Sequence, residues 1–120
     1  MSRLKVYAYK NCSSCQKALG YLDARGVAYS LASIVEQPPD LGELQQMLVH
    51  LGGDVRRLFN TSGTVYRDLK VADQLKAGLS AEAALDLLAR HGMLIKRPFL
   101  LGDKVGCVGF SASAWDQLML

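Results

Sequence analysis

Two cysteines near the start of the chain are the residues best suited to chemistry. Cys12 and Cys15 form a Cys-x-x-Cys motif with Ser13 and Ser14 between them. On a helix, residues three apart lie on one face, so both sulfurs come within reach of a disulfide after small adjustments. The small, polar serines leave the motif open to a partner disulfide or an oxidant. The pair therefore indicates thiol redox chemistry.

The place of the motif in its predicted helix distinguishes the two thiols. The first helical turn carries unpaired N–H groups and the positive end of the helix dipole. These stabilise a thiolate at Cys12 far better than at Cys15, which lies one turn inside. Lys10 adds a positive charge nearby. We therefore expect Cys12 to be the nucleophile and Cys15 the resolving thiol.

Two other interpretations of the cysteine pair stay open. A Cys-x-x-Cys motif can be half of a zinc site, but Cys107, His50 and His91 do not form a second pair of ligands, so no metal is expected. The pair could also be inert, because free cysteine often serves as a small core residue. Cys107 lies in an apolar run and is interpreted as a core residue of a strand.

Hydrophobic periodicity places the motif at a strand-to-helix turn. Residues 3–9 alternate between apolar and other side chains and predict a strand, and residues 13–25 have helical spacing that ends at Gly26. Residues 27–31 alternate again. These segments form a βαβ unit, whose crossover should be right-handed and whose strands should be parallel.

The rest of the chain is predicted to be helical and then to return to strands. Residues 40–92 read as a helical insert, with short helices around 55–59 and 65–69. A hairpin is expected over residues 99–110 and a last helix over 112–120. The order βαβ, helical insert, ββα is typical of α/β thioredoxin-like folds, with a mixed sheet and helices on its faces.

The hairpin should begin at a proline, and Pro98 is the candidate, with a cis bond before it as a hypothesis. Arg97 would then lie close to the start of the first helix. Its guanidinium could hold a thiolate or an oxyanion there by charge-assisted hydrogen bonds. A solvated arginine at the strand edge is the alternative.

Bulk properties narrow the class of protein. A length of 120 residues fits one domain over residues 1–120, with the insert at about 40–92. The net charge is only +3 and the basic residues are scattered along the chain, so no direct binding of nucleic acid is expected. No apolar run approaches the length of a membrane span, and the charged start is unlike a signal peptide. We expect a cytoplasmic protein that does not bind membranes.

Three segments match family motifs in order and spacing: residues 11–18 (NCSSCQKA), 58–69 (LFNTSGTVYRDL) and 94–100 (LIKRPFL). Through them the whole chain resembles the ArsC/Spx family of arsenate reductase-like proteins, which includes YffB-like members. The resemblance implies a thioredoxin-like fold and a catalytic cysteine matching Cys12. It also implies an active-site arginine before a cis-proline, matching Arg97 and Pro98.

The chain departs from this family in its arginines. Arsenate reductases of this type resemble each other in using one cysteine and three arginines. In this chain Asn60 stands in the segment that carries the family's first arginine, and the segment of the last arginine, residues 106–110, contains no arginine. Only Arg97 matches a family arginine. Arsenate should bind weakly, since each charged hydrogen bond lost is worth about 1.5–3 kcal/mol. Cys15 instead resembles Spx-type regulators, whose family role is redox-sensitive binding to RNA polymerase.

Three functional hypotheses follow. The first is a thiol-disulfide oxidoreductase in which Cys12 attacks a protein disulfide or a small oxidised substrate and Cys15 resolves the intermediate. It needs no bound cofactor, and the resemblance implies glutathione or thioredoxin as electron donor. The second is an Spx-like redox-switched regulator that binds RNA polymerase. The third is a glutathione-dependent reductase or a true arsenate reductase. Lys10, Asn60 and Pro98 are expected to support the substrate or the site.

Overall fold

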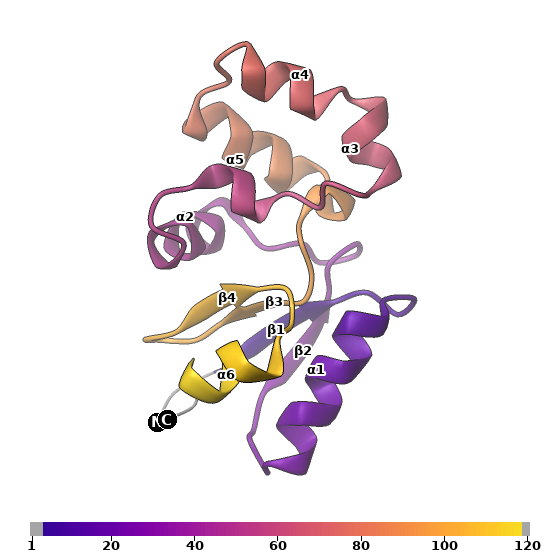
Figure 1. Cartoon of the computed structure of the whole chain (residues 1–120), viewed down its shortest axis with the longest axis vertical. Coiled ribbons are helices and arrows are strands. Elements are labelled where there is room, and N and C mark those ends of the chain that lie inside the picture. Colours follow the sequence, from indigo (N-terminus) through magenta and orange to yellow (C-terminus); the bar gives the residue numbers. More distant parts are fainter. Residues whose placement is uncertain (1–3, 119–120) are drawn as a thin grey trace.

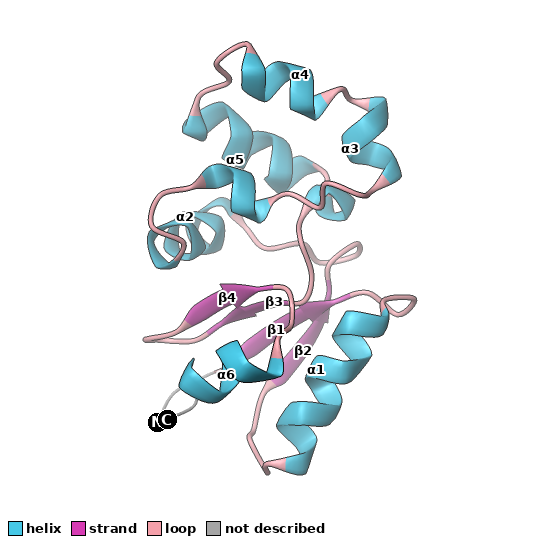
Figure 2. Ribbon diagram, viewed as in Figure 1, coloured by secondary structure: helices cyan, strands magenta, loops and turns pink. Residues whose placement is uncertain are grey.

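The computed structural model describes residues 4–118. The strands are β1 (Lys5–Ala8), β2 (Ser30–Ser33), β3 (Phe99–Leu101) and β4 (Gly106–Val108) (Figure 1). The α-helices are α1 (Ser13–Ala24), α2 (Leu41–His50), α3 (Thr64–Asp68), α4 (Val71–Lys76), α5 (Ala81–Arg90) and α6 (Ala112–Leu118). Short 3-10 helices are η1 (Val55–Leu58) and η2 (Gly92–Leu94) (Figure 2).

The strands form one mixed sheet in the order β2-β1-β3-β4. β1 pairs with β2 in parallel and with β3 antiparallel, and β3 pairs with β4 antiparallel. In this register Val6 of β1 lies beside Leu31 of β2 and Leu100 of β3. The predicted α/β, thioredoxin-like arrangement of a βαβ unit followed by a hairpin is confirmed.

Helices cover both faces of the sheet. α1 and α6 lie on one face, and α2 to α5 lie on the other (Figure 1). Because side chains alternate along a strand, Val6 and Leu100 point toward α1 and α6, whereas Tyr7 and Phe99 point toward the insert. The α1 side buries the following cluster: Leu4, Val6, Ala18, Tyr21, Leu22, Leu100 and Trp115.

The second strand starts later than predicted. Gly26 has a φ of +65° and ends α1, and the N–H of Val27 still donates to the carbonyl of Leu22 at 3.0 Å. This is the bond pattern of a Schellman motif, which holds the chain to the helix end for two residues. The strand therefore begins at Ser30, and the expectation of a strand over residues 27–31 was wrong at both ends.

Two short elements, α4 and η2, were not predicted, since each is too short to display a periodicity. β1 is shorter than the strand expected over residues 3–9, of which residue 3 lies outside the described residues. The last helix is described to Leu118, so residues 119–120 of the expectation lie outside as well. The bond between Arg97 and Pro98 is cis, as hypothesised. Among residues 4–118 no helix is long and apolar enough to cross a membrane.

Candidate active site

Cys12 is the N-cap residue of α1. Its backbone is extended, with φ −109° and ψ 113°, and its Sγ accepts a hydrogen bond from the N–H of Cys15 at 3.2 Å. Its own N–H donates to the carbonyl of Tyr9 at 3.1 Å. A sulfur here takes the position of the side-chain oxygen that usually caps a helix. This bond fixes the sulfur of Cys12 at the start of the helix, beside the N–H groups of the first turn.

Cys15 lies in the first turn of α1, where it is only 1% exposed. Burial raises the pKa of its thiol to about 12, and the hydrogen bond with Cys12 adds to the rise. A backbone hydrogen bond with Tyr9 and the charge of Arg97 oppose it. Both cysteines are free thiols. Near neutral pH Cys15 therefore keeps its proton, and Cys12, which is half-buried, is the more accessible of the two thiols.

Arg97 contacts the aromatic ring of Tyr9, in the loop that leads to the cysteine motif. Its guanidinium carbon lies 4.9 Å from the ring centroid of Tyr9, a cation–π distance. The Nε and Nη1 atoms are buried and have no hydrogen-bond partner among residues 4–118. Arg97 is thus not the solvated arginine of the alternative interpretation, since two of its donor atoms are shielded from solvent and unpaired. The sequence analysis did not single out Tyr9 as a site residue. Its one available signal was its position as an aromatic residue three places before Cys12.

Asn60 and Arg97 line one cavity of about 310 Å³, although they are far apart in the sequence. Two contacts bring their segments together. Phe59 forms an isolated antiparallel bridge with Ile95, and the N–H of Asn60 donates to the carbonyl of Leu94 at 2.7 Å. Arg97 is the sole charged residue among those that line this cavity within the described part of the chain. It therefore offers one guanidinium to an anion.

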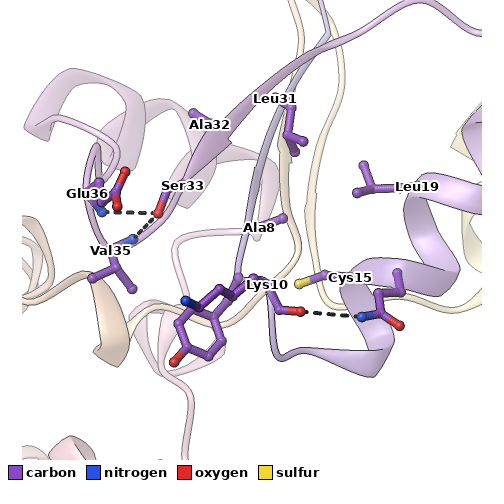
Figure 3. Close-up of a pocket in the computed structure, with 11 residues that line it drawn as sticks. Ala8, Lys10, Cys15, Leu19, Leu31, Ala32, Ser33, Val35 and Glu36 are labelled. Carbon is purple, nitrogen blue, oxygen red and sulfur yellow. Dashed lines mark hydrogen bonds between the residues drawn. The ribbon is translucent and has the colours of Figure 1, made fainter.

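Lys10 and Pro98 occupy different surroundings. Lys10 is exposed and lines a second cavity, of about 630 Å³, which Cys15 also lines (Figure 3). Its carbonyl accepts a hydrogen bond from the side chain of Gln16 at 3.3 Å, which ties the loop to α1. Pro98 is buried, and its carbonyl accepts the N–H of Gly109 at 2.8 Å. Pro98 thus positions Arg97 rather than facing either cavity.

Cys107 lies outside the site. It lies on β4, so the prediction of a strand residue is confirmed, but it is half-buried and packs against the edge of the cluster between the sheet, α1 and α6 rather than inside it. Burial raises the pKa of its thiol to about 12. Within residues 4–118 no three His, Cys, Asp or Glu side chains gather in a way that could hold a metal ion.

The fold and the cysteine pair together define a class: a thiol-dependent redox protein with a thioredoxin-like fold. The family follows from comparison with known proteins. The chain belongs to the ArsC family, whose model matches residues 7–118. The predicted resemblance to this family is therefore confirmed.

Individual relatives share most of their length with this chain. The uncharacterized protein YusI of Bacillus subtilis is 37% identical over 114 residues, which are 95% of this chain and 96% of that protein. A crystal structure described as a possible arsenate reductase from Streptococcus mutans superposes with a TM-score of 0.87 at 36% identity, covering 98% of each chain. The global transcriptional regulator Spx 2 of Oceanobacillus iheyensis is 29% identical over 101 residues, 83% of this chain and 72% of that one.

Proposed function

We propose that this protein is a thiol-disulfide oxidoreductase in which Cys12 is the nucleophile and Cys15 the resolving thiol. The observation that carries the proposal is the 3.2 Å hydrogen bond from the N–H of Cys15 to the sulfur of Cys12 at the start of α1. This bond holds the sulfur of Cys12 at the helix start, and Cys15, which is buried and keeps its proton, lies in the first turn beside it.

The proposed reaction has two exchange steps. The Cys12 thiolate attacks one sulfur of a substrate disulfide, so that a Cys12–substrate bond forms, the substrate S–S bond breaks and the departing thiolate takes up a proton. Cys15 then loses its proton and attacks the sulfur of Cys12, which forms the Cys12–Cys15 disulfide and releases the second substrate thiol. The substrate is reduced by two electrons and this protein is oxidised by two. A thiol reductant, glutathione or thioredoxin, restores both thiols.

The surroundings of Cys15 suit the order of these steps. Its raised pKa has three causes that involve neighbours: burial, the hydrogen bond with Cys12 and the charge on Cys12. The last two disappear once Cys12 is part of a mixed disulfide, because that sulfur carries no charge. Burial remains, opposed by the backbone hydrogen bond with Tyr9 and by the charge of Arg97. We therefore expect the pKa of Cys15 to fall at the step in which its thiolate is needed.

Arsenate reduction is expected to be poor. An arsenate dianion that leaves water needs several fixed cationic donors. Among the described residues that line the cavity beside Asn60, only Arg97 is charged. Disulfide exchange has no such need, because its transition state spreads a single charge over sulfur atoms. Replacing Asn60 by Arg should raise whatever arsenate turnover exists, whereas Arg97→Ala should slow disulfide exchange moderately.

Two measurements test the proposal. Cys15→Ser should leave the Cys12 mixed disulfide unresolved, so that mass spectrometry of the trapped complex identifies the substrate. A coupled arsenate assay, with glutathione and thioredoxin systems as donors, should run beside reduction of a model disulfide. Robust arsenate turnover by the unmodified protein would favour arsenate reductase activity over the present proposal. Failure to reduce any disulfide would exclude it.

A regulatory role is the second candidate, because the Spx 2 relative is a transcriptional regulator. The same cysteine pair would then act as a switch for binding RNA polymerase. A pull-down from cell lysate under reducing and oxidising conditions separates the two functions. Redox-dependent recovery of RNA polymerase, with no turnover of disulfides, would support the regulator.

A further inference from the structure

A hollow of about 630 Å³ lies between α1 and β2, beside the resolving cysteine. Figure 3 shows Leu31 on the strand side of it and Leu19 on the helix side, with Ala8 and Cys15 below both leucines in that view. Leu31 is 58% exposed, and Val35 at one end of the hollow is 45% exposed. Large apolar side chains that remain this exposed around a concave surface commonly mark a place where another molecule binds. Leu31 and Val35 have no role in the exchange chemistry proposed above.

The open edge of the sheet runs along this hollow, since β2 is an edge strand. The N–H groups of Ser30 and Ile34 donate to the carbonyls of Leu4, just before β1, and Ala8, at its end, at 2.9 and 3.0 Å. In a parallel pair alternate residues point their backbone groups to one side, so the N–H and C=O of Leu31 point away from β1. Within residues 4–118 no strand or side chain bonds to them. Leu31 therefore presents both an apolar side chain and free backbone groups.

The turn that follows β2 is held in place. The hydroxyl of Ser33 accepts the N–H groups of Val35 and Glu36 at 3.3 and 3.2 Å (Figure 3). The rim of the hollow carries Lys10 and Glu36, whose opposite charges give it no net preference for an anion or a cation. The recognition that this surface offers is thus apolar contact plus a strand edge.

We propose that this hollow is the docking site for an extended, apolar segment of a protein disulfide substrate. The inference rests on the proposed disulfide exchange, because the reaction itself determines the occupant. Cys15 lines the hollow and lies one turn along α1 from Cys12, so a substrate chain that is bonded to Cys12 and runs along α1 enters the hollow. A peptide there adds to the edge of β2 by pairing with Leu31 and places an apolar side chain between Leu19 and Leu31. Glutathione, a small charged molecule, fits this lining less well.

The test compares activated peptides. Each carries one cysteine as a mixed disulfide with nitrothiobenzoate, flanked two residues away on both sides by leucine in one peptide and by serine in the other. Stopped-flow absorbance of the released thiolate gives the rate constant. Hydroxyethyl disulfide and glutathione disulfide serve as small substrates in a separate reduction assay. The variants are Leu31→Ser and Val35→Ser, and Val49→Ser on α2, 78% exposed, is the matched control.

The unmodified protein should react about tenfold faster with the leucine peptide than with the serine peptide, as expected for an apolar side chain that enters a pocket. Leu31→Ser should remove most of this preference and leave the rate with hydroxyethyl disulfide unchanged, while Val49→Ser should alter neither. Val35→Ser repeats the test should Leu31→Ser fold poorly.

The outcomes separate the docking proposal from the proposed function. If both hollow variants keep the preference of the unmodified protein while disulfides are still reduced, the docking proposal is wrong and the exchange chemistry stands. A faster reaction with the mixed disulfide of glutathione and nitrothiobenzoate than with either peptide, unaffected by Leu31→Ser, would also overturn it. If no disulfide is reduced at all, the proposed function itself fails.

Discussion

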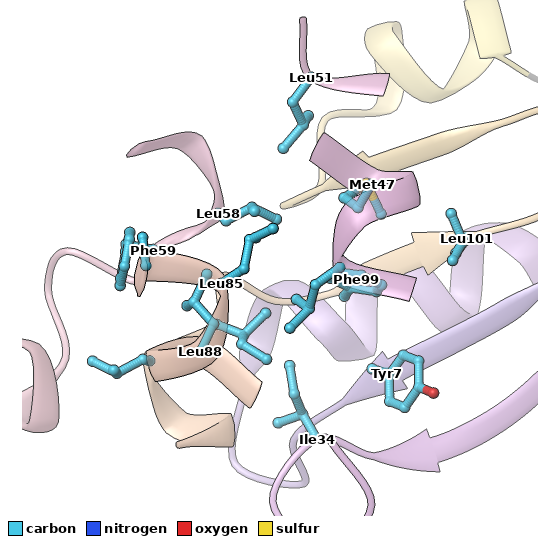
Figure 4. Packing of buried hydrophobic residues seen from close by; sticks show 14 of the residues in the cluster. Tyr7, Ile34, Met47, Leu51, Leu58, Phe59, Leu85, Leu88, Phe99 and Leu101 are labelled. Atoms are coloured by element: carbon cyan, nitrogen blue, oxygen red, sulfur yellow. The ribbon is translucent and has the colours of Figure 1, made fainter. Parts of the chain in front are cut away.

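A buried tyrosine joins the sheet to the helical insert, and its contribution can be measured. Tyr7 on β1 is 1% exposed and packs edge-on against Phe99 (Figure 4). Its hydroxyl donates to Oε1 of Glu43 on α2 at 2.7 Å. Glu43 also accepts the N–H of Asp40 at 3.2 Å, which closes a capping box, and pairs with Lys5 at 3.6 Å. Burial, followed by this carboxylate, holds the pKa of Tyr7 well above its ordinary value.

The perturbation is a double-mutant cycle with Tyr7→Phe and Glu43→Ala. A hydrogen bond to a charged group contributes about 1.5–3 kcal/mol, so Tyr7→Phe should lower the free energy of unfolding by that order. Glu43→Ala also loses the capping contact and should cost about 3 kcal/mol in total. The exposed pair with Lys5 adds less than about 1 kcal/mol. Because both single changes remove the same bond, the double variant should be more stable than their sum predicts by about 1.5 kcal/mol.

Urea unfolding followed by circular dichroism measures all four corners of this cycle. Phe99→Leu, which alters the same cluster but no hydrogen bond, serves as a control for packing loss around Tyr7. Additive effects of Tyr7→Phe and Glu43→Ala, within about 0.5 kcal/mol, would refute the argument that this bond joins the sheet to α2. The rate at which Cys12 is alkylated at neutral pH should remain the same in every variant, since the network lies on the insert side of the sheet.

Two further predictions concern stability. A Cβ on Gly92 would overlap the carbonyl oxygen of Ile34, so Gly92→Ala should lower the free energy of unfolding by about 1–3 kcal/mol. Gly20 lies in open space on α1, so Gly20→Ala should raise the free energy of unfolding by about 0.5–1 kcal/mol. Shifts of the urea midpoint in the same direction for both variants would contradict this prediction. Burial raises the pKa values of Cys15 and Cys107 from 9.0 to about 12, so the folded state keeps protons that the unfolded state loses. The free energy of unfolding should therefore fall as the pH rises from 9 toward 12. Cys107→Ala should make this fall shallower by up to about 1.4 kcal/mol per pH unit. Identical slopes of unfolding free energy against pH for the variant and the unmodified protein would refute a raised pKa at Cys107.

Local features of the chain could be predicted because neighbouring residues decide them. The capping position of Cys12, the helix that ends at Gly26 and the capping box that starts at Asp40 depend on side chains within a few positions of each other. The proline at the start of the hairpin was found by its place in the order of elements. These same features position the cysteine pair, which is why the redox class could be predicted from the sequence.

The rest depended on contacts between distant segments. No pattern along the chain predicts that the ring of Tyr9 will lie beside the guanidinium of Arg97, or that a bridge between Phe59 and Ile95 will bring Asn60 to the same cavity. The free strand edge beside the hollow exists because β2 pairs with β1 on one side and with no strand of residues 4–118 on the other. Sequence by itself determined the two sulfurs and their helix, since local backbone geometry is enough for both. Tertiary packing decided that the charge of Arg97, the two cavities and the open edge of β2 surround these sulfurs. Burial and the distances between charges arise only when distant segments pack together.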